Sequence, residues 1–229
     1  MLSLDKLRFA QDGFTLSLSG RIARGERVAL LGASGSGKST LLSLIAGFER
    51  AEAGRILWAG TDITAAPVAA RPVSILFQDG NLFPHLTAFD NVALGLRPDL
   101  RLSAEDRDRV ADSLSQVGLG DHAGKRPAAL SGGQQARVAL ARMLLRDRPL
   151  ALLDEPFAAL DPGLKTEMLA LVRELCAARG LTLLMACHDL RDAERLCDRL
   201  WLLEDGAKVL DLGLSGLRDD PPEGLRPWM

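Results

Sequence analysis

A glycine-rich stretch near residue 35 has the residue types and spacing of a phosphate-binding loop. It reads Gly32-Ala33-Ser34-Gly35-Ser36-Gly37-Lys38-Ser39-Thr40. An apolar run at 27–31 precedes it and a helical pattern at 38–46 follows it, which is the context this motif requires. Its backbone N–H groups can surround phosphates, Lys38 can reach the terminal phosphates, and the Ser39 hydroxyl can ligate Mg²⁺. The sequence therefore predicts a site for the phosphates of a nucleotide.

A second candidate site is a pair of carboxylates at the end of an apolar run. Residues 150–155 read Leu-Ala-Leu-Leu-Asp154-Glu155. The end of a buried strand is where open parallel sheets collect ligands. We expect Asp154 to hold Mg²⁺ through its water shell and Glu155 to orient and deprotonate an attacking water. The alternative is a solvated acidic loop, but a phosphate loop in the same chain needs such a carboxylate.

A second glycine turn lies about ninety residues after the phosphate loop. It reads Leu130-Ser131-Gly132-Gly133-Gln134 and opens a helical pattern, so it can also bind anions. Three interpretations stay open at this point. The chain has two separate sites, or this turn completes the site of a neighbouring chain, or Ser131 only caps a helix.

The elements that must position these residues follow from the hydrophobic pattern. Residues 2–18 alternate apolar and polar, which predicts an antiparallel pair that turns at 11–13. Runs at 73–77, 149–153 and 181–187 are apolar without alternation, as in strands buried on both faces of a mostly parallel sheet. A hairpin is predicted at 201–211, around Asp205-Gly206.

Helical patterns fill much of the remaining chain. No convincing strand occurs between about 87 and 146, where Ser103 begins one helix and residues 134–145 continue another, so this segment is a candidate inserted subdomain. Asp161-Pro162 begins a helix that Gly180 ends. The tail from Gly213 lacks periodicity, and we expect it to be only loosely ordered.

Composition excludes several classes of protein. A chain of 229 residues with 47% hydrophobic residues can bury a substantial core, which excludes a disordered chain. Its net charge of −2 gives no general attraction for nucleic acid or anionic lipid. The longest uncharged apolar run, 181–187, falls far short of the roughly 20 residues that cross a bilayer. The three cysteines lack metal-ligand spacing, and we expect buried thiols in a reducing compartment.

Together these motifs resemble the ATP-binding cassette ATPases. The phosphate loop, Gln78, LSGGQ at 130–134, LALLDE at 150–155, Ala159-Leu160-Asp161 and His188 stand in that family's order over nearly the whole chain. The resemblance implies an α/β fold with a phosphate-loop (RecA-like) core at 1–84 and 147–215, an N-terminal antiparallel β part, a helical subdomain at 85–146 and a tail at 216–229. It also implies a head-to-tail dimer around two ATP molecules, each held by one chain's phosphate loop and the other's LSGGQ.

The resemblance assigns roles to residues whose chemistry alone is ambiguous. Gln78 would contact Mg²⁺ and the attacking water, His188 would bind the γ-phosphate and hold Glu155, and Asp161 would link the two sites while also capping its helix. Adenine would stack on Phe9, with Phe14 as the competing candidate. Two departures are Gln135-Ala136, where the family usually has a basic residue, and Cys187, where Ser or Thr is common.

Within the family, residues 71–87 are similar to the ATPases of bacterial thiamine importers, and the short C-terminus agrees. Polyamine, ferric iron and inorganic anion importers are the runner-up. The resemblance implies membrane permease subunits as partners, a periplasmic solute-binding protein reached through them, and a peripheral place on the cytoplasmic face of the inner membrane.

A cassette ATPase acting on nucleic acid is disfavoured because the chain has one cassette and no long coiled coil. A regulator without hydrolysis would lack Glu155 or His188, and both are present.

Overall fold

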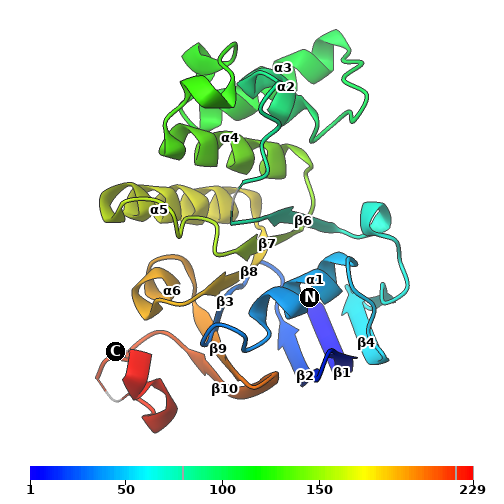
Figure 1. The fold of residues 1–229 in the computed structure, drawn as a ribbon, viewed down its shortest axis with the longest axis vertical. Coiled ribbons are helices and arrows are strands. Elements are labelled where there is room, and N and C mark those ends of the chain that lie inside the picture. Colours follow the sequence, from blue (N-terminus) through cyan, green and yellow to red (C-terminus); the bar gives the residue numbers. More distant parts are fainter. Residues whose placement is uncertain (79, 220, 229) are drawn as a thin grey trace.

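The fold is organised around one mixed sheet of ten strands, seen in a computed structural model that describes residues 1–78, 80–219 and 221–228 (Figure 1). The strand order is β5-β4-β1-β2-β10-β9-β3-β8-β7-β6. The strands are β1 (Leu2–Gln11), β2 (Phe14–Ile22), β3 (Arg27–Leu31), β4 (Ala53–Trp58), β5 (Thr61–Asp62), β6 (Val73–Leu76), β7 (Leu150–Asp154), β8 (Thr182–Cys187), β9 (Arg199–Glu204) and β10 (Ala207–Gly213).

The parallel half of the sheet carries the predicted buried strands. Five adjacent strands run parallel to one another, in the order β6, β7, β8, β3 and β9. The next strand, β10, folds back antiparallel to β9 as the predicted hairpin. All six residues of β8 are buried, because both faces of this strand are covered. Parallel strands end at the same edge, so the loops after β3, β6, β7 and β8 are brought together there.

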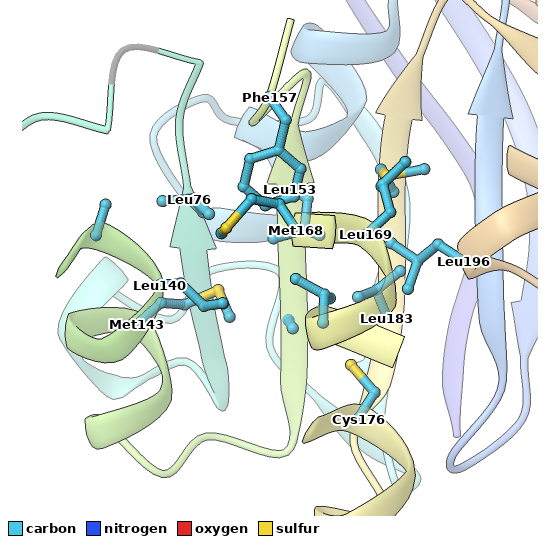
Figure 2. Packing of buried hydrophobic residues seen from close by; sticks show 14 of the residues in the cluster. Leu76, Leu140, Met143, Leu153, Phe157, Met168, Leu169, Cys176, Leu183 and Leu196 are labelled. Carbon is cyan, nitrogen blue, oxygen red and sulfur yellow. The ribbon is translucent and has the colours of Figure 1, made fainter. Parts of the chain in front are cut away.

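Helices cover the two faces of the sheet. α1 (Lys38–Ala46) packs its leucines on one face with the β1–β2 pair, while α5 (Pro162–Arg179) and α6 (Leu190–Leu196) cover the other. Alternate residues of β7 divide between the two cores, since Leu152 faces α1 and Leu153 faces α5. Figure 2 shows Leu153 and Leu183 of the strands beside Met168 and Leu169 of α5.

The remaining helices gather at one end of the molecule. α2 (Ala88–Ala93), α3 (Ala104–Gln116) and α4 (Gly132–Leu145) lie together beyond α5 in Figure 1. Ser103 accepts a hydrogen bond from the backbone of Asp106 and begins α3 with the predicted capping box. Short 3₁₀ turns complete the chain at Val68–Ala70, Gly120–His122, Pro127–Ala129 and Glu223–Trp228. Within the described ranges, no helix is both long and apolar enough to cross a bilayer.

The structure differs from the sequence-based expectations in two places. β4 and β5 extend the N-terminal antiparallel pair, although no strand was predicted there. The prediction of a loosely ordered tail is wrong for its described part, because Leu217 and Leu225 are 6% and 0% exposed in the core. Arg218 also donates two hydrogen bonds, of 2.8 and 2.6 Å, to Glu194 of α6. Single leucines without periodicity anchor this segment, which is why a periodicity argument missed it.

Candidate functional site

The phosphate loop runs from the end of β3 to the start of α1. Gly37 precedes α1 with φ of 100°, in the left-handed region that favours glycine. A Cβ on Gly32 would lie 2.4 Å from the carbonyl oxygen of Leu203, so only glycine fits there. The Lys38 ammonium donates hydrogen bonds of 2.7 and 2.9 Å to the carbonyls of Gly32 and Ala33, inside the curl of the loop.

Polar groups of the loop are left free for a ligand. The Ser36 hydroxyl is buried and has no hydrogen-bond partner among the described residues. An unpaired buried hydroxyl costs free energy, and a phosphate oxygen would satisfy it. The loop also precedes a helix N-terminus, where the dipole favours negative charge. These features fit the phosphates of a nucleotide.

The two carboxylates at the end of β7 differ in environment. Asp154 Oδ1 accepts a hydrogen bond of 2.9 Å from the Ser39 hydroxyl. Burial raises the pKa of Asp154 above that of an ordinary carboxyl, although the bond from Ser39 opposes the shift. Glu155 has φ of 44°, an unusual backbone conformation for a residue with a side chain. Such strain persists where the surrounding fold enforces it, and it often marks a functional site.

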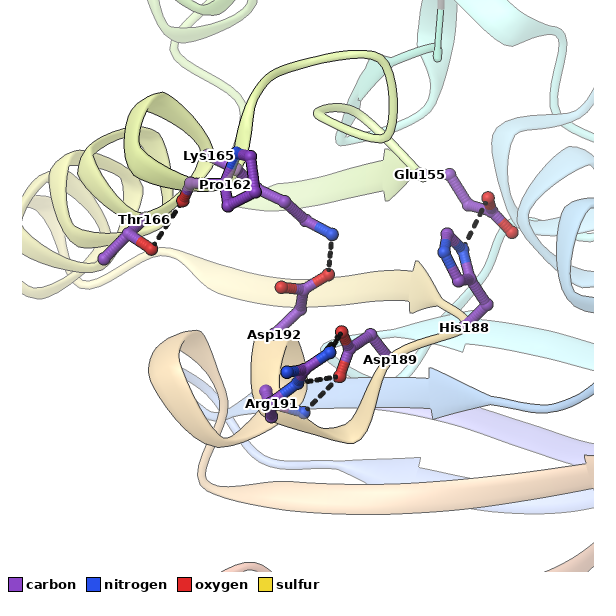
Figure 3. A network of polar contacts seen from close by, with 8 residues as sticks. All are labelled: Glu155, Pro162, Lys165, Thr166, His188, Asp189, Arg191 and Asp192. Carbon is purple, nitrogen blue, oxygen red and sulfur yellow. Dashed lines mark hydrogen bonds and ion pairs between the residues drawn. The ribbon is translucent and has the colours of Figure 1, made fainter. Parts of the chain in front are cut away.

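Glu155 is held by the loop that follows β8. Its Oε2 atom lies 3.0 Å from Nδ1 of His188, and its backbone N–H bonds the carbonyl of Ala186 (Figure 3). His188 is exposed, with 53% of its side-chain surface accessible, so the other ring nitrogen can meet a ligand. The predicted base and histidine are therefore in contact in a single chain.

A cleft of about 450 Å³ opens over the phosphate loop and is the natural place for a nucleotide. Phe9 and Phe14 both line it, together with Ser34, Gly35, Gly37, Lys38, Ser39, Thr40, Glu155, Gln11 and Asp12. Phe9 is only 7% exposed and packs into the core, whereas Phe14 is partly exposed. The Phe14 ring also reaches Gly37, since a Cβ there would lie 2.8 Å from Phe14 Cζ.

The second glycine turn does not line this cleft. The Ser131 hydroxyl caps α4 by accepting a hydrogen bond of 3.3 Å from the backbone N–H of Gln134, and the side-chain oxygen of Gln134 accepts one of 3.0 Å from the backbone N–H of Ser131. Gly132 instead lines a separate cleft of about 180 Å³ with Gln78, while Gly133 is buried. The LSGGQ turn and the phosphate loop thus border different clefts of one chain.

Two further predicted residues lie at helix and strand ends. Gln78 is exposed just beyond β6. Asp161 accepts a hydrogen bond of 3.0 Å from the backbone of Leu164, which is the capping role expected beside Pro162.

Sequence reasoning missed four residues close to these loops. Gln11 and Asp12 line the large cleft, but the sequence showed them only as a turn between two strands. Lys165 of α5 and Asp192 of α6 form an ion pair behind Glu155 and His188 (Figure 3). For Lys165 and Asp192 the available signal was position, since each of these two residues stands in the first turn of a helix that follows a candidate active-site loop.

The arrangement is suited to hydrolysis of a phosphoanhydride bond between the phosphates of a nucleotide. The loop and Lys38 supply positive potential for phosphates, and Glu155 supplies a base. The hydroxyl of Ser39 and the carboxylate of Asp154, in hydrogen-bond contact, are hard oxygen donors of the kind Mg²⁺ prefers. The donor set therefore fits a magnesium ion carried with the nucleotide.

Known proteins share both the sequence and the fold. A family model described as ABC transporter matches residues 16–158. The chain is 64% identical to the thiamine import ATP-binding protein ThiQ of Jannaschia sp. strain CCS1, over the full length of both. It is 52% identical to the protein of the same name from Cereibacter sphaeroides, over all of this chain and 99% of that one.

A solved structure extends the similarity to a complex with nucleotide. It is the dimeric post-hydrolysis state of the ATP-binding cassette MJ0796 bound to ADP and Pi. The TM-score is 0.80 at 31% identity, covering 94% of this chain and 100% of that one.

Proposed function

Because the chain belongs to the ABC transporter family, we propose that it is the ATP-hydrolysing subunit of a thiamine importer. One observation carries the enzymatic part of this proposal. The Ser39–Asp154 contact and the Glu155–His188 contact both lie at the edge of the sheet where the phosphate loop begins. A binding module without hydrolysis would have no need of a strained glutamate held by a histidine.

Each residue of the site has a defined task in hydrolysis. The phosphate loop and Lys38 bind the phosphates of ATP and offset the charge that develops on them. Glu155 orients the attacking water and accepts its proton, and His188 keeps the Glu155 carboxylate in place. Ser39 and Asp154 would hold Mg²⁺, which when bound neutralises charge on the phosphates. Gln78 would reach the metal and the water from the neighbouring cleft.

Phe14 is the better platform for the adenine ring. Stacking needs an exposed ring face near the phosphate loop, and the Phe14 ring reaches Gly37. Phe9 lies deeper in the core and supports the strand. This assignment reverses the order of the two candidates expected from the sequence.

The second glycine turn is best used by another copy of the chain. It begins a helix and carries Ser131 on an exposed turn, yet it borders a different cleft from the phosphate loop. In a two-fold dimer, the LSGGQ turn of each chain would close the nucleotide site of the other. The similar cassette MJ0796 is a dimer with ADP and Pi, which supports this arrangement.

Gln78 and residues 80–86 form the proposed contact with the permease subunits, and residue 79 between them lies outside the described residues. Phe83 is 46% exposed, and its ring lies 6.0 Å from that of His85 in an edge-on arrangement. Aromatic side chains are enriched in protein–protein interfaces, so an exposed Phe83 five residues after Gln78 suits a contact with a partner. The chain would then sit peripherally at the cytoplasmic face of the inner membrane, linked through the permease to a periplasmic binding protein.

The transported solute is thiamine by similarity to the two relatives named above. The test is to delete the gene and measure uptake of labelled thiamine at nanomolar concentration, beside spermidine and ferric iron. We expect thiamine uptake alone to fall, and to return when the wild-type gene but not the Glu155→Gln gene is restored. Normal thiamine uptake with loss of another solute would contradict the substrate and leave the ATPase assignment intact.

A further inference from the structure

Two helices begin directly behind the loops that carry the candidate base and histidine. α5 starts at Pro162, seven residues after Glu155, and α6 starts at Leu190, two residues after His188. Lys165 lies in the first turn of α5, where its backbone N–H bonds the carbonyl of Asp161 at 2.9 Å. Asp192 lies in the first turn of α6, where its N–H bonds the carbonyl of Asp189 at 3.2 Å.

The side chains of Lys165 and Asp192 join these two first turns in an ion pair (Figure 3). The pair is shielded from water, with 18% of the Lys165 side chain and 7% of the Asp192 side chain exposed. A small cavity of about 20 Å³ lies beside it, and Glu155, His188, Lys165 and Asp192 all line that cavity. The ion pair and the Glu155–His188 contact therefore border the same small space.

A buried ion pair is a weak means of stabilising a fold, because desolvation of the charges offsets their attraction. It is a strong means of fixing geometry, because removing one partner leaves a buried charge without compensation. Here the two partners come from the two elements whose preceding loops must stay in register for Glu155 to meet His188. The side chains of Glu155 and His188 meet through one hydrogen bond of 3.0 Å, beside the backbone bond from Glu155 to the carbonyl of Ala186.

We propose that Lys165 and Asp192 are positioning residues that fix α6 against α5 and thereby hold His188 in contact with Glu155. This inference rests on the proposed ATPase function. Neither residue lines the cleft over the phosphate loop, so they act through His188 and Glu155 rather than on the nucleotide.

The test compares steady-state ATP hydrolysis by the full-length protein and its variants. Lys165→Met and Asp192→Asn should each lower kcat by about tenfold or more while the KM for ATP stays within about twofold, since only the catalytic geometry is disturbed. Lys165→Arg keeps the charge and should retain kcat within about threefold. Arg218→Gln is the control, because it removes an ion pair with Glu194 of the same helix without touching α5.

Single variants that unfold would not obscure the result. The double variant Lys165→Met/Asp192→Leu removes both charges, so its urea midpoint should approach that of the wild type while its kcat stays low. Wild-type turnover in this folded double variant would overturn the proposal. In a His188→Ala background, Lys165→Met should cause little further loss of kcat, because its effect passes through the missing imidazole. Fully additive losses would likewise overturn it.

Two outcomes of the ATPase measurement distinguish the proposed function from the positioning role. A wild-type protein that hydrolyses no ATP, alone or with its permease, would contradict the proposed function. An active wild type with unchanged Lys165→Met and Asp192→Asn variants would contradict only the positioning role.

Discussion

The hydroxyl of Ser39 lies 2.9 Å from Oδ1 of Asp154, although 115 residues separate them in the chain. Ser39 stands in the first turn of α1 and Asp154 at the end of β7, so the contact joins the phosphate loop to the candidate catalytic carboxylates. Both atoms are oxygens that can bind a metal ion. A metal carried with the nucleotide would be held by these two oxygens, directly or through water, in place of the hydrogen bond.

The first prediction concerns Asp154. Asp154→Asn keeps the side-chain shape but removes the charge that offsets Mg²⁺. We expect the Mg²⁺ concentration for half-maximal ATPase activity to rise by about tenfold or more, since a charged ligand contributes over 1.4 kcal/mol. The measurement is a Mg²⁺ titration of turnover at saturating ATP. An unchanged titration midpoint would remove Asp154 from the metal site.

The second prediction concerns Glu155. Glu155→Gln keeps the size of the side chain and removes the base, so turnover should fall by at least about a hundredfold. ATP binding should be retained, and an ATP-bound dimer should accumulate in size-exclusion chromatography. Hydrolysis close to the wild-type rate would exclude Glu155 as the base.

Local patterns in the sequence predicted the helix and the strand that carry candidate site residues. The helix from Lys38 to Ala46 and the strand leading to Asp154 follow from apolar runs, a glycine loop and a helix-ending Gly47. These features depend on neighbours within about ten residues, which a sequence shows directly.

Contacts between distant parts could not be predicted in the same way. The Lys165–Asp192 pair depends on how α5 and α6 pack on the sheet, and nothing at either position marks its partner. The burial of Phe9 depends on the core that its strand shares with α1, which the sequence does not show. Phe9 was preferred to Phe14 only for its position in the sequence relative to Lys38. Leu225 is buried by the hairpin it folds onto, with no periodic signal of its own.

The third prediction separates the two phenylalanines of the cleft. Phe14→Ala should weaken ATP binding by about fivefold or more, because an aromatic contact contributes about 0.5–1.5 kcal/mol beyond burial. Phe9→Ala should instead lower the free energy of unfolding by about 3–5 kcal/mol, as expected for a buried phenylalanine. Fluorescent nucleotide titration and urea unfolding measure the two effects. The reverse pattern would return the adenine platform to Phe9.

The fourth prediction tests the shared site. Lys38→Ala and Ser131→Arg should each abolish ATP-dependent closure in pure homodimers. A mixed dimer has one site with both lesions and one in which an intact Lys38 faces an intact Ser131, so closure should return on mixing. Crosslinking or size-exclusion chromatography is a better readout than turnover, because hydrolysis that requires both sites would hide the rescue. Independent sites within each chain would give no rescue at any mixing ratio.

The fifth prediction concerns the three cysteines, all of which are buried. Burial raises the pKa of Cys176 to about 11 and that of Cys187 to about 12, and it raises the pKa of Cys197 well above its usual value. In the unfolded chain these thiols ionise near pH 8.5, so above that pH the unfolded state loses protons that the native state keeps. Stability is therefore full below about pH 8.5 and falls as the pH rises toward the folded-state values.

This fall should be measurable as a lower urea midpoint at about pH 10.5 than at about pH 8, with a loss on the order of 2 kcal/mol for each buried thiol. The chain contains no tyrosine, so no phenol titrates in the same range. Lysines do titrate there, and a Cys176→Ala variant controls for them because it should show a shallower pH dependence than the wild type. Native protein at pH 8 should also react with a thiol reagent only as fast as it unfolds. Rapid labelling of all three thiols in the folded protein would contradict their burial and the pH dependence derived from it.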